Sequence, residues 1–169
     1  HLLLQEAFED ETMIADATIK IGLGGVDLTS VSSYTDRDIL VSRDASALTG
    51  SVSVDLGFPT AGVLLPSNLR DTTKVKSFTQ EVRLSSNGDG PLQWVLGGFY
   101  SNTNRDYAQR LPTPGYDAFT DVAFGAGTSA AVANGFPLTS PYNADINYDI
   151  AQKAVFGDAS SALADQSTL

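Results

Sequence analysis

Residues 77–86 read SFTQEVRLSS and residues 92–100 read LQWVLGGFY, and these two stretches decide the fold class. In the first, one face carries Phe78, Gln80, Val82 and Leu84, and the other carries Thr79, Glu81, Arg83 and Ser85. A period of two is typical of a β-strand with one apolar face. The intervening residues, NGDGP at 87–91, are turn formers. The two stretches therefore predict a β-hairpin.

Three further strands are predicted on either side of this hairpin. Residues 14–23 also alternate, and Gly24-Gly25 after them suits a two-residue turn because both positions tolerate positive φ. Residues 26–36 are rich in Thr, Ser, Val and Tyr, which favour strands. A last strand is expected at 148–160, followed by a tight turn at 161–166. Residues 1–13 fit either a short helix or a loop.

Two long stretches, 37–76 and 102–147, lack sustained periodicity and are predicted to be loops, the first with one short strand at 50–56. Loops of this length are unusual inside a compact soluble domain. In an up-and-down sheet, the short turns then gather at one end and the long loops at the other. Outer-membrane β-barrels have this asymmetry. We therefore expect an all-β chain of about five antiparallel up-and-down strands of a transmembrane barrel. The pattern alone leaves a soluble β-sandwich open.

Composition excludes several classes of function. The 169 residues carry a formal net charge of −10, which argues against nucleic-acid binding. There is no Cys, and the single His is residue 1, so disulfides, thiolate metal sites and His-dependent catalytic triads are not expected. Twenty carboxylates are present, but no spacing singles out an acid–base pair. We expect no enzyme activity and no catalytic, cofactor-binding or metal-binding residue.

Two local motifs fail on inspection. Residues 145–149, DINYD, resemble the opening of an EF-hand calcium loop, but its sixth position is Ile150 and its twelfth is Phe156. Gly22-x-Gly24-Gly25 lies between two predicted strands, with no helix to present an N-terminus to a phosphate.

The hairpin at 77–100 closely resembles one in the barrel of TonB-dependent receptors, the plugged outer-membrane transporters of Gram-negative bacteria. Residues 28–38, LTSVSSYTDRD, resemble an earlier upward strand and its exit, and residues 154–159, AVFGDA, resemble a later downward strand. The three segments come in the family's order. Predicted strand ends carry aromatic residues that suit interfacial girdles, namely Tyr34, Phe78, Trp94, Phe99 and Tyr100.

The chain also departs from this family. Its members have an N-terminal box that binds TonB, a globular plug and about 22 strands. Here no box and no plug are found, and the chain ends in Leu169 rather than in a terminal aromatic. We therefore expect an interior slice of a barrel, with two unpaired strand edges.

The resemblance implies uptake of a scarce nutrient, such as a siderophore, cobalamin or a glycan, across the outer membrane of a Gram-negative bacterium. It implies three partners: the TonB complex, through the parent's N-terminal region; outer-membrane lipid; and the nutrient. The two long loops supply the ligand-facing candidates, which are Arg43, Arg105, Tyr107, Arg110, Tyr116, Asp117 and Tyr142. Two alternatives remain, a soluble β-rich binding module and, less favoured, a hydrolase.

Overall fold

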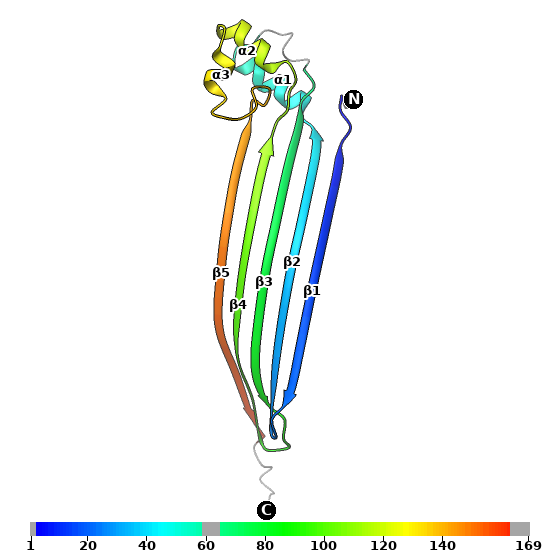
Figure 1. Ribbon diagram of the computed structural model, residues 1–169, viewed down its shortest axis with the longest axis vertical. Coiled ribbons are helices and arrows are strands. Elements are labelled where there is room, and N and C mark those ends of the chain that lie inside the picture. The colour runs from blue at the N-terminus through cyan, green and yellow to red at the C-terminus, as the bar shows by residue number, and fades with distance from the viewer. Residues whose placement is uncertain (1–2, 59–64, 163–169) are drawn as a thin grey trace, which may run out of the picture. The chain divides into compact units, whose positions relative to one another are not determined.

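The computed structural model describes residues 3–58 and 65–162, which form five antiparallel strands with three short helices. The strands follow the order of the sequence across one open sheet, β1-β2-β3-β4-β5, as Figure 1 shows. Their bounds are Ala7–Gly22 for β1, Val26–Asp44 for β2, Asn68–Ser86 for β3, Leu92–Arg110 for β4 and Asn143–Ser161 for β5. The predicted up-and-down β-sheet is confirmed, and the described strands do not close into a barrel. A tight turn was expected at 161–166, but Ser161 is the last residue of β5, and the residues of this turn from 163 onward lie outside the described part of the chain.

The strands are longer than the sequence pattern indicated, so the predicted loops 37–76 and 102–147 are shorter. β2 continues to Asp44 and β4 to Arg110. These extensions are held by polar pairs, such as Ser42 Oγ donating to Asn68 Oδ1 at 2.8 Å. In these extensions polar residues occur on both faces of the strands, so the sequence shows no alternation of apolar and polar residues there. The predicted strands are therefore shorter than the observed ones. For residues 1–13 the sequence allows either a short helix or a loop. The structure shows neither from Ala7 onward, where the chain forms β1.

The short strand expected at 50–56 is wrong, because this segment belongs to α1, Ser46–Asp55. Ser and Val alternate at 51–54, a period of two that also fits a strand. The buried residues of the segment are instead Ser46, Thr49, Gly50 and Ser53. Spacings of three and four place them on one helical face. The predicted second loop likewise contains α2, Tyr116–Phe124, and α3, Thr128–Val132.

The chain divides into two compact units, and each strand contributes a segment to both. We call the first the loop unit, which comprises His1–Glu11, Arg37–Lys74 and Arg105–Asn147. The second, the turn unit, comprises Thr12–Asp36, Val75–Asn104 and Tyr148–Leu169. Its first hairpin turn is Gly24-Gly25, whose φ angles of 71° and 75° are those that the sequence led us to expect.

The turn unit has one predominantly apolar sheet face. Side-chain contacts fix the faces: Ser30 Oγ accepts from Gln80 Nε2 at 2.9 Å, whereas Ser77 and Thr103 pair at 2.8 Å on the opposite side. The apolar face carries Met13, Ala15, Ala17, Ile19, Ile21, Leu28, Tyr34, Phe78, Val82, Leu84, Leu92, Trp94, Leu96, Tyr100, Ala151, Val155 and Ala159. Its charged residues are Asp36, Lys76, Asp149 and Lys153, and Asp36 pairs with Lys76 at 3.8 Å.

Polar residues in the middle of the apolar face bond to one another. Gln80 donates to Ser30, and the Ser32 hydroxyl donates to Gln80 Oε1 at 2.5 Å. On the opposite face, Glu81 and Arg83 form an ion pair of 3.2 Å. The turn unit therefore has an apolar face whose central polar groups are satisfied internally and an opposite face with exposed charges.

The sheet has almost no apolar core of its own. Among the described residues, the buried hydrophobic side chains are Ala45, Leu111 and Tyr116, all in the loop unit. Large apolar side chains of the turn unit remain exposed, among them Ile19 at 58% and Leu96 at 57%. Among the described residues of the turn unit, no second layer covers either face of the sheet.

Candidate ligand-binding site

A cavity of about 340 Å³ lies in the loop unit beside α1. α1 contributes three residues, Leu48, Thr49 and Val52, and α2 contributes Tyr116. The strands contribute Leu69 of β3 and Gln109 of β4, and the remaining residues are Leu56, Leu111, Pro141 and Tyr142. We call it the α1 cavity. Its volume is at the lower end of the range of small-molecule sites, and its lining is mainly apolar.

Thr49 is one of the residues that line the α1 cavity, and its hydroxyl is buried without a hydrogen-bond partner among the described residues. Thr49 is only 5% exposed. Two other buried hydroxyls, one on α1 and one on α2, do have hydrogen-bond partners. Ser53 Oγ donates to the Thr49 carbonyl at 2.6 Å, and Thr120 Oγ1 donates to the Tyr116 carbonyl at 2.7 Å. An unsatisfied buried hydroxyl costs about 1–3 kcal/mol. It therefore requires an explanation.

A hydrogen-bond network around Asp71 fixes the strand side of the α1 cavity. Asp71 is buried and pairs with Arg43. Gln109 Nε2 donates to Asp71 Oδ1 at 2.5 Å, and the Tyr107 hydroxyl donates to the same oxygen at 3.0 Å. Because Gln109 also lines the cavity, the carboxylate holds a cavity residue in place.

A second, larger cavity of about 740 Å³ adjoins the first and shares Leu56, Tyr116, Pro141 and Tyr142 with it. We call it the α2 cavity. Phe58 packs in it against Tyr116 and Phe124, with ring centroids 5.1 Å apart in both pairs. Asn143 is among the lining residues, and its Oδ1 is the second buried side-chain atom without a partner among the described residues. Asn143 Nδ2 donates to the Ser140 carbonyl at 2.8 Å.

The seven predicted ligand-facing residues fall into two groups. Tyr116 and Tyr142 line both cavities, and Arg43 and Tyr107 reach the α1 cavity indirectly through Asp71. The other three do not line either cavity. They are Arg105, Arg110 and Asp117. The Arg105 guanidinium lies 6.0 Å from the Tyr107 ring centroid, and Asp117 is in the first turn of α2. Arg110 forms an ion pair of 2.6 Å with Asp145 and lies over the Phe136 ring.

Sequence reasoning missed Thr49, Gln109 and Asn143. Gln109 and Asn143 lie beside the ends of strands whose extent was underestimated. The small residues at 46, 49, 50 and 53 repeat at helical spacing and could have predicted a helix with Thr49 on its buried face, but the sequence gives no sign that the Thr49 hydroxyl lacks a partner.

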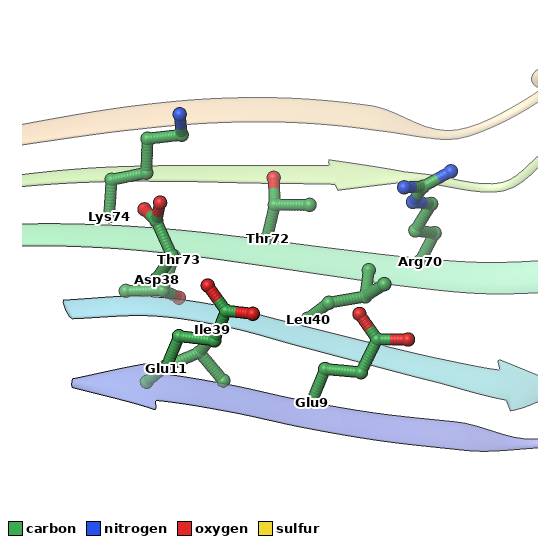
Figure 2. A pocket seen from close by; sticks show the side chains of 9 residues that line it. All are labelled: Glu9, Glu11, Asp38, Ile39, Leu40, Arg70, Thr72, Thr73 and Lys74. Atoms are coloured by element: carbon green, nitrogen blue, oxygen red, sulfur yellow. The ribbon is translucent and has the colours of Figure 1, made fainter.

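A third hollow, of about 240 Å³, has a charged lining and lies across the sheet within the loop unit (Figure 2). Glu9 and Glu11 come from β1, Asp38 comes from β2, and Arg70 and Lys74 come from β3. All five residues are exposed. Exposed charges of this kind are well hydrated and interact weakly, so we do not assign a ligand to this groove.

The segment after α2 is anchored by an aspartate. The Ser129 backbone N–H at the start of α3 donates to Asp121 Oδ1 at 2.8 Å. Hydrogen bonds from the Ser129 backbone and side chain favour the carboxylate and hold the pKa of Asp121 below its ordinary value. The fold of this part of the loop unit is therefore linked to an ionised aspartate.

None of the helices in the described part of the chain has the length and hydropathy needed to cross a bilayer. Within residues 3–58 and 65–162, no cluster of three or more His, Cys, Asp or Glu side chains is arranged to hold a metal ion. Comparison of the chain with protein-family models, curated proteins and solved structures found no match.

Proposed function

We propose that this chain is part of the barrel of a TonB-dependent outer-membrane receptor that takes up a scarce nutrient. The observation that carries the proposal is the exposed apolar face of the turn unit. Soluble proteins rarely leave so extended an apolar patch uncovered. A bilayer would remove this surface from water without a second protein layer.

The internal pairing on that face supports the same proposal. Groups exposed to hydrocarbon must satisfy their hydrogen bonds within the protein. Gln80 does so with Ser30 and Ser32. The opposite face carries Glu81 and Arg83 and suits a polar lumen.

The remaining elements of the proposal come from the resemblance of residues 28–38, 77–100 and 154–159 to the family. In this account the TonB complex supplies energy from the inner-membrane proton gradient, lipid surrounds the turn unit, and the loop unit contacts the nutrient. The alternative, a soluble β-rich binding module, would require a buried apolar core. The few buried hydrophobic residues of the described chain do not favour it.

Two lysine substitutions on β3 test the membrane-facing role. Val82→Lys places a charge on the apolar face, whereas Thr79→Lys places one on the opposite face. Each variant is refolded with phospholipid vesicles, and co-sedimentation and resistance to protease are measured. A lysine facing hydrocarbon costs about 2–4 kcal/mol near the bilayer centre, so Val82→Lys reduces insertion and Thr79→Lys does not. Equal insertion of both variants and of the unmodified chain contradicts the proposal.

A further inference from the structure

We infer that the outer edge of β5 pairs with β5 of a second copy of this chain. The two strands are antiparallel and centred on Ala151, so that Asp149 of each copy meets Lys153 of the other. The inference goes beyond the proposed function and does not depend on it, because the backbone of a strand edge can pair with or without lipid.

The backbone of β5 offers an unpaired edge. Among the described residues, β5 is the last strand of the sheet and has β4 as its neighbour (Figure 1). At one end of this pair the Leu111 N–H donates to the Tyr142 carbonyl, and at the other the Ala162 N–H donates to the Pro91 carbonyl, which is the same register. Bonded residues alternate along an antiparallel pair. Even-numbered residues of β5 therefore bond to β4, and odd-numbered ones, including Ala151, turn their N–H and C=O groups to the edge.

This edge is long and lacks the usual obstacles to pairing. β5 has 19 residues and contains no proline, and its residues from Asp145 onward are exposed. Natural proteins protect edge strands by making them short, by placing proline or charge on them or by covering them. Only charge is available to β5, so its charged residues decide which strand can pair with it.

Asp149 and Lys153 are the charged residues of β5 on the apolar face of the turn unit. Asp36 and Lys76 on the same face pair with each other at 3.8 Å, whereas Asp149 accepts a long hydrogen bond of 3.4 Å from Asn102 Nδ2. Four residues of strand separate Asp149 from Lys153 by about 13 Å, too far for them to pair within one chain. A partner strand that neutralises both must therefore supply one base and one acid.

A second β5 supplies this pattern. Asp149 and Lys153 lie two residues before and two residues after Ala151 and have opposite signs. In an antiparallel pair centred on Ala151, each Asp149 is directly opposite the other copy's Lys153, and opposite charges in this position stabilise the pair. A register centred on Asp149 or on Lys153 would instead place like charges together. The charges therefore select both the partner and the register.

The contact has two-fold symmetry, so it closes with two copies. The paired strands run in opposite directions, whereas copies that enter a bilayer from one side run in the same direction. The dimer therefore belongs to the chain outside a bilayer, and insertion replaces it.

Charge exchange tests the pairing. The full chain is kept in detergent, which covers the apolar face without fixing strand direction, and association is measured by sedimentation equilibrium. Asp149→Lys and Lys153→Asp each bring like charges together twice and should weaken the dimer by about tenfold. The chain that carries both substitutions regains opposite charges and should associate like the unmodified chain. An equimolar mixture of the two single variants should also regain affinity.

Cysteine substitution tests the register, because the chain has no Cys of its own. In the inferred dimer the two Ala151 residues are directly opposite, with Cα atoms about 5.5 Å apart, which a disulfide can span. Ala151→Cys should therefore give a covalent dimer on oxidation. Ala17→Cys, an exposed position on the apolar face of the other edge strand, β1, is the matched control and should not.

The inference is overturned if the unmodified chain is monomeric in detergent, if the double charge variant associates as weakly as the single variants, or if Ala17→Cys crosslinks as readily as Ala151→Cys. It is also overturned if Asp149→Asn combined with Lys153→Gln strengthens association, because the two charges would then protect the edge from pairing. The vesicle test of the proposed function uses substitutions on β3, so the two results are independent.

Discussion

The ring of Phe156 on β5 lies over Gly97 on β4. A methyl group added at Gly97 would lie closer than 3.0 Å to three atoms of that ring. The φ of Gly97 is not in the left-handed region, so space rather than backbone conformation restricts this position. Aromatic side chains that cover glycines on neighbouring strands are a known device for holding register. The contact joins β5 to β4 on the face of the turn unit that lies opposite its apolar face.

Gly97→Ala should therefore destabilise the chain by about 0.5–1.5 kcal/mol, because the partly exposed Phe156 ring must turn away from the added methyl group. Gly98→Ala is the matched control, since a methyl there meets only a backbone oxygen at an ordinary 3.8 Å. Urea unfolding followed by circular dichroism measures both. A Gly97→Ala variant as stable as the Gly98→Ala variant would show that Phe156 does not pack on Gly97.

Thr49→Val should stabilise the ligand-free chain by about 1 kcal/mol, because it removes a buried hydroxyl that has no partner. Thr120→Val provides the contrast, since it breaks the 2.7 Å bond to the Tyr116 carbonyl and should be neutral or destabilising. Thermal unfolding midpoints of the two variants are compared. If Thr49→Val lowers the midpoint more than Thr120→Val does, the Thr49 hydroxyl is bonded in the folded chain.

Asp71→Ala should destabilise the loop unit by about 1–3 kcal/mol, because Tyr107 and Gln109 lose their common acceptor. Arg43 is half exposed and can turn to water, so its loss of a partner adds little. Glu81→Ala removes an exposed ion pair with Arg83 and should cost less than about 1 kcal/mol. Equal losses of unfolding free energy in the two variants would contradict the assigned role of Asp71.

Acidification should weaken the region around α3. The pKa of Asp121 is lower in the folded chain than in the unfolded chain, so the unfolded chain takes up the proton first as pH falls. The contribution is complete above about pH 4, the ordinary pKa of aspartate, and disappears as pH falls through the folded value. Thermal unfolding between neutral and acidic pH should therefore show a smaller acid-induced loss for Asp121→Asn. An identical loss in both proteins would contradict the linkage.

The β-hairpin and the strand order could be predicted because residues 14–23 and 77–86 alternate and because the turn formers at 24–25 and 87–91 mark turns. The strand extensions could not, since pairs such as Arg43–Asp71 and Arg110–Asp145 replace apolar periodicity with long-range polar contacts.

The candidate site was only partly predictable for a related reason. Tyr116 and Tyr142 were selected as aromatic loop residues, and both line the cavities. Thr49 was missed because its role depends on burial and on the absence of a partner, which only the folded arrangement of α1 reveals.

The most direct test of the account uses Trp94, which is the chain's single tryptophan and lies on the apolar face near the start of β4. The chain is refolded with vesicles whose lipids carry bromine either close to the headgroup or near the bilayer centre, and tryptophan emission is recorded. The account predicts strong quenching, greatest for bromine close to the headgroup, because aromatic girdles lie at the interface. Emission from the folded chain that no brominated lipid quenches, while a water-soluble quencher does, would contradict a membrane-facing apolar surface.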